Sequence, residues 1–378
     1  MTADRYDVVV VGGGIAGASV GYELAASARV LLVEAETVLG FHATGRSAAM
    51  FLETYGNADF RALTVASRRF LEQPADEFQS ELLKPRPLLQ FARNGRGTVI
   101  ARLFDEVSAI VTDAALVDER SVRQLCPIVR EGVVESALYE PSAMELDVDA
   151  LHQGFVRGFH GRGGTVVRGA GVERLERVAH GWTVRLSDGT TTHAAIVVNA
   201  AGAWADVVAA SAGLAAIGLV PRRRSAYLTP GPDGLRLDEL PLLYDVDETF
   251  YLKPEGGQLL CSPADKTPTE PGDARPDELE IARSLEEIRE FTTLLARSVR
   301  SPWAGLRTFS PDDNLVVGPA AEDPAFFWLA GQAGYGIQTA PALARYAAAA
   351  ILGHELPQDV LALGLRPDRV SPARFVRR

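Results

Sequence analysis

Three glycines near the start of the chain are spaced in a pattern that could bind a dinucleotide. Gly12, Gly14 and Gly17 form G-x-G-x-x-G within the stretch VVVVGGGIAGAS, and Glu34 follows Gly14 at a distance of 20 residues. Glycines at these positions let backbone amides approach a pyrophosphate at the first turn of a helix, and the acid can accept hydrogen bonds from both hydroxyls of a ribose. The glycines and the acid together predict a dinucleotide site.

The elements that must position these residues can be predicted from the same stretch. The valine run that ends at residue 11 is typical of a strand buried on both faces in a parallel sheet. Residues 15–27 have helical composition, and residues 29–34 (RVLLVE) predict a second buried strand. A glycine motif alone would be weak evidence. A strand, a helix and a strand in this order form a βαβ unit whose first turn holds the glycines, and this context supports the site.

The rest of the chain interrupts the pattern of alternating strands and helices twice. Residues 41–50 (FHATGRSAAM) are rich in small and hydroxyl side chains, as expected of a segment along an extended cofactor, and Asn57 predicts the cap of an amphipathic helix. The alternation is lost after about residue 84, returns near residue 146, and is lost again in a second, β-rich insert. We therefore predict a discontinuous nucleotide-binding domain made of residues 1–84, 146–215 and 311–378, and a substrate-binding domain made of residues 85–145 and 216–310.

Composition excludes several classes of protein. The 378 residues, 47% hydrophobic and 23% charged, suggest a soluble globular protein of about two domains. The formal net charge of −11 argues against a nucleic-acid partner. Cys126 and Cys261 lie far apart in the sequence, which excludes a disulfide scaffold and a paired-cysteine redox or metal site. No apolar run is long enough for a membrane helix and the first residues do not form a signal peptide, so we expect a cytoplasmic protein.

The motifs taken together resemble a known family. VVVVGGGIAGAS, HATGRSAA, DVDALHQG, VVNAAGAWA, PRRRSAY, FYLKP, WAGLR and AGYGIQTAP occur in one order over nearly the whole chain. In this respect the sequence is similar to the flavoprotein superfamily of D-amino-acid oxidase, glycine oxidase and sarcosine oxidase, and within it to the bacterial D-arginine and D-amino-acid dehydrogenases. The resemblance implies an α/β fold with a Rossmann-like FAD-binding domain and an inserted α+β substrate domain built on an antiparallel sheet.

The same resemblance implies non-covalent FAD as the cofactor, because neither cysteine lies in a motif for covalent attachment. Residues 334–339 would bring a helix N-terminus to the flavin pyrimidine, where free amides stabilise the negative charge of the reduced ring. The implied cofactor contacts are Gly12, Gly14, Ile15, Ala16, Gly17, Glu34, Ala35, Thr44, Gly45, Arg46, Ser47, Ala48, Ala49, Gly171, Val172, Ala201, Gly202, Trp204, Gly305, Gly334, Tyr335, Gly336, Ile337, Gln338 and Thr339.

The resemblance also assigns residues to the substrate. Arg224 and Arg307 match positions that hold the substrate carboxylate, a role that suits the guanidinium fork, and Tyr251 matches a phenol that donates to the same carboxylate. Tyr55 corresponds to a residue on a mobile lid, and Gly334 would offer its backbone carbonyl to the amine. The alternatives are that the arginines are solvated surface residues and that the tyrosines only pack.

Specificity is expected to depart from that of arginine-preferring members. Leu88 stands where those members carry an acid for the distal cation, and Met50 stands where they carry a histidine; Gln338 is assigned to the same pocket. A more apolar pocket would favour a neutral or hydrophobic side chain, unless Leu88 and Met50 are ordinary core residues.

These observations predict an FAD-dependent oxidation of a D-amino acid. Hydride would pass from Cα to flavin N5, and the imino acid would hydrolyse to a 2-oxo acid and ammonia. His42 is the nearest candidate base, but a structural role is expected for it, so no side-chain base is assigned. The alternatives are oxidation of N-substituted amino acids or 2-hydroxy acids, or a flavin-binding protein without turnover. The electron acceptor, oxygen or quinone, stays open.

Overall fold

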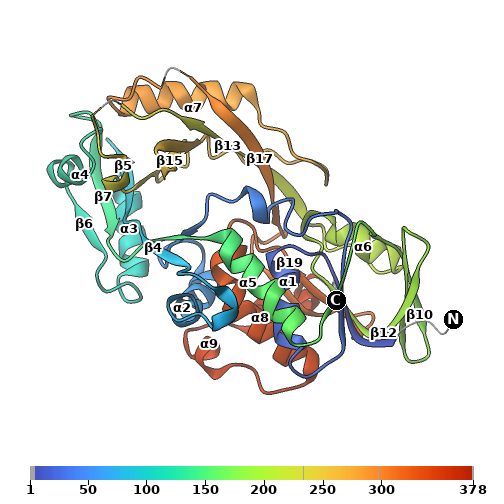
Figure 1. Cartoon of the computed structure of the whole chain (residues 1–378). Coiled ribbons are helices and arrows are strands. Elements are labelled where there is room, and N and C mark those ends of the chain that lie inside the picture. The colour runs from blue at the N-terminus through green and yellow to red at the C-terminus, as the bar shows by residue number, and fades with distance from the viewer. Residues whose placement is uncertain (1–4, 233, 297, 377–378) are drawn as a thin grey trace.

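The computed structural model describes residues 5–232, 234–296 and 298–376. Residues 1–4 and 377–378 of the predicted nucleotide-binding domain, and residues 233 and 297 of the predicted substrate-binding domain, lie outside the described part. Two sheets of eight strands each form the framework of the chain. We call them the first sheet and the second sheet. In Figure 1 the second sheet, with helix α7 (Glu278–Phe291) along its outer side, lies above the first sheet and its helices.

The first sheet is built around the predicted βαβ unit. β1 pairs in parallel with β2 on one side and with β12 on the other, and β2 pairs in parallel with β9. β12 pairs with β11 as an antiparallel hairpin, with Asp188 in the turn, and its carboxyl-terminal half pairs in parallel with β19. The strands are β1 (Arg5–Val11), β2 (Val30–Glu34), β9 (Thr165–Arg168), β10 (Val172–Val178), β11 (Gly181–Leu186), β12 (Thr191–Asn199), β18 (Val316–Pro319) and β19 (Phe326–Ala330).

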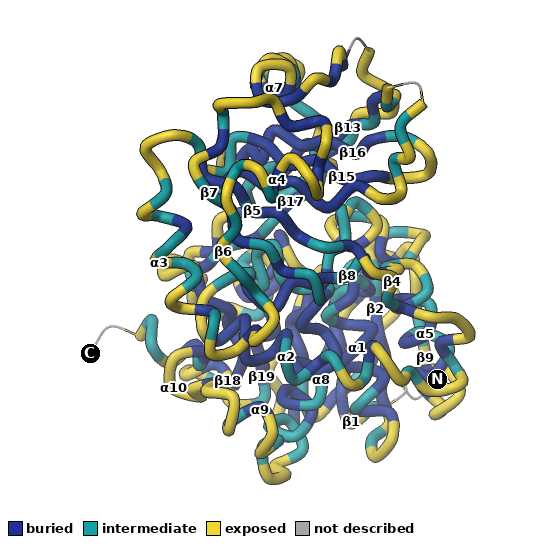
Figure 2. Tube along the Cα trace, turned by 90° about the vertical axis from the view of Figure 1, so that its left-hand side faces the viewer, coloured by how far each residue is buried: buried dark blue, intermediate teal, exposed yellow. Residues whose placement is uncertain are grey.

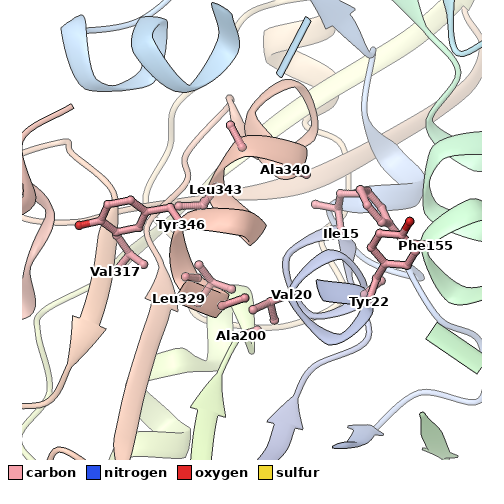
Figure 3. Packing of buried hydrophobic residues seen from close by; sticks show 14 of the residues in the cluster. Ile15, Val20, Tyr22, Phe155, Ala200, Val317, Leu329, Ala340, Leu343 and Tyr346 are labelled. Carbon is pink, nitrogen blue, oxygen red and sulfur yellow. The ribbon is translucent and has the colours of Figure 1, made fainter. Parts of the chain in front are cut away.

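Alternate residues of the central strands enter two different cores. Val8 and Val10 face α1 (Ile15–Leu24), α5 (Val148–Gly161) and α8 (Gly336–Leu352), whereas Val9 and Val11 face the hairpin of β10 and β11 and helix α6 (Ala205–Ser211). Figure 3 shows the first of these cores, in which Leu343 of α8 and Val20 of α1 face a common interior. Burial on both faces explains why these strands are continuous apolar runs.

The second sheet joins the two inserted segments. Its order is β17-β13-β16-β15-β14-β5-β7-β6, and every neighbouring pair is antiparallel except β5 with β14. The expected antiparallel sheet is therefore corrected at this one pair, where strands from separate segments meet without a hairpin. The strands are β5 (Leu88–Arg93), β6 (Ala115–Val117), β7 (Val134–Glu140), β13 (Val220–Thr229), β14 (Leu242–Asp245), β15 (Tyr251–Glu255), β16 (Gln258–Ser262) and β17 (Arg300–Phe309).

Helix α7 was not expected in the second, β-rich insert. Asp277 precedes it and accepts hydrogen bonds from the amides of Leu279 and Glu280, and its apolar residues Ile281 and Ile288 pack into the core of the second sheet. Aspartate at an N-cap followed by apolar residues at helical spacing is a readable signal. The remaining helices of this part are α3 (Gly97–Val107) and α4 (Glu119–Leu125).

A small sheet lies where the two large sheets meet. β3 (Met50–Phe51) and β4 (Leu83–Pro85) both pair with β8 (Met144–Leu146). The predicted domain boundaries after residues 84 and 145 fall inside these paired strands, and the division into domains stays a prediction. Helix α2 (Ala58–Glu72) begins, as predicted, after Asn57, whose side chain accepts two backbone hydrogen bonds. Two short helices, α9 (Gln358–Ala362) and α10 (Pro367–Val370), follow α8.

Figure 2 shows buried residues along the inner strands of both sheets and exposed residues along the outer loops. The two large sheets therefore have separate cores, two on the faces of the first sheet and another against the second sheet. Among the residues that the structure describes, no helix combines the length and the apolar character that crossing a membrane requires.

Candidate active site

A cavity of about 320 Å³ opens at the carboxyl ends of the parallel strands of the first sheet. Val11 at the end of β1, Glu34 at the end of β2 and Ala200 just after β12 line it, and the far wall comes from β17 of the second sheet. The carboxyl ends of parallel strands are where open α/β sheets bind their ligands, because the turns that follow the strands leave a crevice there. We call this space the outer cavity.

The glycine turn is shaped as the sequence predicts. Gly12 has φ +107°, and a Cβ atom there would lie 2.5 Å from the carbonyl oxygen of Ala200, so a larger residue would fill the turn. The amide of Gly13 donates to Oε2 of Glu34 at 2.6 Å, and the amide of Glu36 donates to Oε1 at 2.8 Å. Glu34 thus braces the turn while its carboxylate lines the outer cavity, where each oxygen keeps a second lone pair for a ligand hydroxyl.

Most of the expected cofactor residues line the outer cavity, whereas Ala49 and Gln338 line only a second, smaller cavity described below, and four others line neither. At Gly17 a Cβ atom would lie 1.8 Å from the carbonyl of Gly12, so this glycine lets α1 pack against the turn. The Thr339 hydroxyl donates to the carbonyl of Tyr335, whose ring stacks on Phe60. Sequence spacing could not separate such supporting residues from lining ones. The four residues that line no described cavity are Gly17, Gly45, Tyr335 and Thr339.

Arg46 also lines the outer cavity, but its guanidinium is used within the protein. Nη1 donates to the carbonyl of Ala304 at 2.9 Å and to that of Ala274 at 3.2 Å, and Nη2 pairs with Asp273 at 2.5 Å. Arg46 therefore connects the segment of residues 41–50 to β17 and to the loop before α7.

The start of α8 forms another wall of the outer cavity. Gly336 and Ile337, its first residues, line the cavity, and the first amides of a helix of 17 residues have no intrahelical partner. The side-chain amide nitrogen of Gln332, Nε2, is buried here without a hydrogen-bond partner in the described structure. Free donors and the positive end of the helix dipole suit a heterocycle that carries negative charge. The outer cavity therefore fits a dinucleotide with a redox-active ring at α8.

A second cavity of about 70 Å³, which we call the inner cavity, adjoins the outer one and shares with it Ser47, Ala48, Arg224, Tyr251, Arg307, Gly334 and Ile337. Its remaining walls come from β3 and the residues on either side of it, from β14 and β15, and from α8. Those residues are Ala49, Met50, Leu52, Tyr55, Leu242, Tyr244, Lys253 and Gln338.

The pairing of β13 with β17 decides which arginine of the triplet at residues 222–224 faces this cavity. Arg224 is opposite Gly305, and both face the same side of the sheet as Arg307. Arg223, one residue earlier, points to the other face and pairs with Asp265 at 3.0 Å and with Asp277 at 2.8 Å. Arg222 shares the face of Arg224, but it lines neither cavity and its guanidinium lies over the ring of Phe309 and 3.5 Å from Asp313. Two guanidinium groups, those of Arg224 and Arg307, therefore line the inner cavity.

The two arginines have donors without partners. Nε and Nη1 of Arg224 are buried and make no hydrogen bond within the described structure, and its Nη2 lies 3.6 Å from Oε2 of Glu248. Nη1 of Arg307 makes one long hydrogen bond, 3.4 Å, to the hydroxyl of Tyr55. A buried guanidinium with free donors is costly, so these groups indicate a site for an anion.

Glu248 is placed to compete for Arg224. Although burial alone would raise the pKa of Glu248, nearby Lys266, Arg224 and Arg307 hold it below its ordinary value, so the carboxylate is charged. Lys266 donates to it at 2.8 Å. Glu248 also has a positive φ of 55°, which a non-glycine residue adopts only under constraint.

Three tyrosines surround the arginines. The ring of Tyr244 meets those of Tyr55 and Tyr251 edge to face, each at a centroid distance of 6.0 Å. Burial, together with Tyr55 and Glu248, raises the pKa of Tyr244 well above 10, although Arg224 and Arg307 oppose the rise. The phenol therefore stays neutral and can donate a hydrogen bond.

Sequence reasoning missed Tyr244. The signal was the strand LLYDV, which precedes FYLKP by a turn of three residues, because antiparallel pairing sets Tyr244 opposite Tyr251.

One expected pocket residue lies outside the cavities, and another lines the inner cavity but is hydrogen-bonded within the protein. Leu88 lines neither cavity, which corrects the expectation; it is buried in the apolar cluster beneath the inner cavity, beside its parallel neighbour Leu242, which does face the cavity. Gln338 lines the inner cavity, but its amide accepts from Leu52 N at 3.1 Å and donates to Leu52 O at 3.3 Å and to Thr64 at 2.9 Å. It supports the turn after β3 and has little capacity left for a ligand.

Met50 and His42 line different cavities. Met50 lines the inner cavity. His42 lines the outer cavity, where its Nε2 lies 2.9 Å from Glu36 and its ring lies against Trp204. It is absent from the inner cavity's lining, in keeping with a structural role.

Comparison with known proteins gives one family and several relatives. The family described as "FAD dependent oxidoreductase" matches residues 7–350. FAD-dependent oxidoreductase domain-containing protein 1 of Bos taurus is 28% identical over 407 residues, which cover 93% of this chain and 82% of the relative. Mitochondrial dimethylglycine dehydrogenase of Homo sapiens is 25% identical and matches 95% of this chain, which spans only 44% of that relative.

A solved structure shows the same fold. The crystal structure of glycine oxidase from Geobacillus kaustophilus has a TM-score of 0.83 and 22% identity, covering 96% of this chain and 99% of that one.

Proposed function

The chain belongs to the family of FAD-dependent oxidoreductases, and from this premise we propose that it oxidises the carbon–nitrogen bond next to the carboxylate of a D-amino acid with a small, neutral side chain. The outer cavity would hold FAD and the inner cavity the amino acid. When bound, FAD supplies the acceptor for two electrons. The protein's own residues bind the substrate, orient it and keep water from the reacting atoms.

The observation that carries this proposal is the pair of arginines at the inner cavity. Within the part of the chain that the structure describes, Arg224 has two buried donors without a partner, and the hydrogen bond of Arg307 is the long one to Tyr55. A substrate carboxylate would satisfy both guanidinium groups with charge-assisted hydrogen bonds. The phenols of Tyr251 and Tyr244 line the same cavity and would donate hydrogen bonds to the same group.

The walls of the inner cavity support a small, neutral side chain. Met50, Leu52 and Leu242 are apolar, and among the described residues that line the inner cavity none is acidic. A distal ammonium or guanidinium would therefore be desolvated without a partner, which disfavours D-arginine as the substrate. The volume of about 70 Å³ favours a short side chain.

Orientation supplies the chemical contribution of the protein. Holding the carboxylate between Arg224 and Arg307 directs the carbon that bears the amine toward the opening between the two cavities, where Ala48 and Ile337 stand. No histidine or acid is among the described lining residues of the inner cavity, so the amine is expected to lose its proton to solvent before the substrate enters the site. The start of α8 would stabilise the charge that develops on the acceptor.

A second candidate substrate is an N-methylated glycine. It is favoured by one specific observation, the match of 95% of this chain to a dimethylglycine dehydrogenase. The carboxylate site would be the same, and an N-methyl group would occupy the space given above to the side chain.

An anaerobic titration separates these possibilities. The FAD-loaded protein is mixed with glycine, D- and L-alanine, D-leucine, D-arginine, sarcosine, dimethylglycine and lactate, and the loss of flavin absorbance is followed. Bleaching by D-alanine but not L-alanine supports the proposal, and bleaching by sarcosine or dimethylglycine alone supports the second candidate. Bleaching by none of these amino acids overturns both. Admitting air afterwards tests oxygen as the acceptor, and adding a quinone tests the alternative.

A further inference from the structure

The turn at residues 52–55 places a phenol at the carboxylate site. It follows β3 directly and carries Tyr55, which lines the inner cavity and accepts the hydrogen bond from Arg307. The ring of Tyr55 also contacts Tyr244 and Tyr335, at centroid distances of 6.0 and 4.7 Å. A shift of this turn would therefore move one wall of the site.

Glu140, at the end of β7, holds the turn from below. Its side chain is fully buried, Oε1 accepts from the amide of Glu53 at 2.9 Å, and Oε2 accepts from the hydroxyl of Thr54 at 2.5 Å. No lysine or arginine among the described residues forms an ion pair with it. Burial is the main reason that the pKa of Glu140 is raised to about 7, and the charge of Glu53 adds to the rise. A buried carboxyl group without a cation is expensive to keep, which indicates a specific role.

Other contacts hold different parts of the same turn. Gln338 of α8 binds both backbone groups of Leu52, and Arg68 of α2 binds the carboxylate of Glu53 through two bonds of 2.8 Å. The contacts of Glu140 are those to the two residues that immediately precede Tyr55. They restrain the backbone where it enters the residue that faces Arg307.

We propose that Glu140 is a positioning residue for substrate binding, which acts by fixing the turn that presents Tyr55 to Arg307. This inference rests on the proposed function in one respect: its expected effect on substrate binding requires that an amino acid reduces the flavin. Either protonation state keeps the anchor: a charged carboxylate accepts both hydrogen bonds, and a neutral carboxyl group accepts from the amide of Glu53 and donates to the oxygen of Thr54. Glutamine offers the same acceptor and donor, whereas alanine offers neither.

The first test measures the anchor without substrate. Hydrogen exchange of the peptide covering residues 50–60 is compared, in the FAD-loaded protein, for wild type, Glu140→Gln and Glu140→Ala. We expect faster exchange in Glu140→Ala only. The matched control is Glu135→Ala on the same strand, because Glu135 also accepts two backbone amides, those of Gly95 and Gly97, but away from the cavities. Unchanged exchange in Glu140→Ala overturns the proposal.

The second test measures binding with the amino acid that bleaches the wild-type flavin fastest. Rapid-mixing experiments give the apparent dissociation constant and the limiting rate of flavin reduction. In Glu140→Ala we expect the dissociation constant to rise about tenfold, the scale of one lost hydrogen bond, with the limiting rate within about twofold. Glu140→Gln should behave as wild type.

Non-additivity distinguishes positioning from general weakening. If Glu140 acts through Tyr55, the double variant Glu140→Ala, Tyr55→Phe should bind the amino acid no more weakly than whichever single variant has the higher dissociation constant. Additive losses, or a fall in the limiting rate alone, overturn the inference. Should Glu140→Ala prove insoluble, Thr54→Val removes one of the two bonds and is tested in the same way. Failure of the proposed function is recognised separately, because no amino acid would then bleach the flavin of the wild-type protein. The exchange experiment would still decide whether Glu140 restrains the turn at residues 52–55.

Discussion

Adding one methyl group at Gly334 should disturb the carboxylate site without touching its chemistry. A Cβ atom built on Gly334 would lie 2.8 Å from Nη1, 2.9 Å from Cζ and 3.2 Å from Nε of Arg307. Ordinary contacts begin near 3.4 Å, so the guanidinium would have to move by about 0.5 Å. The backbone of Gly334 is not in the left-handed region, and alanine is therefore permitted there.

The displacement has a calculable consequence. Arg307 is confined on one side by Tyr55, so it cannot relax freely away from the new methyl group. Because a misplacement of about 1 Å can lower a rate about 100-fold, a shift of half that size should lower kcat/KM by about tenfold. FAD should remain bound, since the three atoms nearest the added Cβ all belong to Arg307, and the glycine turn and Glu34 are unchanged.

The assay is steady-state oxidation of the best substrate, with flavin content measured from absorbance. Gly161→Ala is the matched control, because a Cβ atom at the end of α5 would meet nothing within 4 Å. The double variant Gly334→Ala, Arg307→Leu should be no slower than Arg307→Leu alone. An unchanged kcat/KM in Gly334→Ala, or additive losses in the double variant, would refute the placement of the carboxylate at Arg307.

Three further outcomes are expected. Arg307→Leu should lower kcat/KM by the equivalent of about 3–5 kcal/mol with FAD retained, and wild-type efficiency would contradict the carboxylate assignment. Because the pKa of Glu140 is raised from 4.5 to about 7, ionisation lowers the wild-type free energy of unfolding as the pH rises through this window. Glu140→Gln cannot ionise, so in urea titrations it should gain up to about 3 kcal/mol over wild type between pH 4.5 and 8, at about 1.4 kcal/mol per pKa unit; a constant difference would mean that the carboxyl does not titrate there. Leu88→Glu should lower the free energy of unfolding by about 3 kcal/mol or more, because it buries a charge opposite Glu140, and should leave the substrate panel unchanged; a new preference for basic D-amino acids would return Leu88 to the pocket.

Local patterns in the sequence were sufficient to predict the glycine turn and the acid that line the outer cavity. The valine run, the three glycines and Glu34 lie within 30 residues of one another, and hydrogen bonds between neighbours such as Glu34 and Gly13 hold them. Such short-range geometry depends on backbone rules that apply to any chain. The same holds for the cap of α2 at Asn57.

Pairing between strands that are distant in the sequence determines which side chains line the inner cavity. Whether Arg223 or Arg224 faces the cavity depends on the register of β13 against β17, and a shift of one residue would exchange them. Leu88 is kept from the cavity because β5 pairs in parallel with β14, a contact between two separate inserts. Neither register can be derived from the residues near these positions.

The sequence by itself therefore determined the βαβ unit, the dinucleotide turn and the kind of side chains available for a carboxylate. Only the tertiary structure decided that Arg224, Arg307, Tyr55 and Tyr244 meet around one small cavity, and that Glu140 lies beneath the turn that carries Tyr55. The physical reason is that a turn is fixed by the conformational limits of a few adjacent residues, whereas a site between two sheets is fixed by which strands pair and in which register.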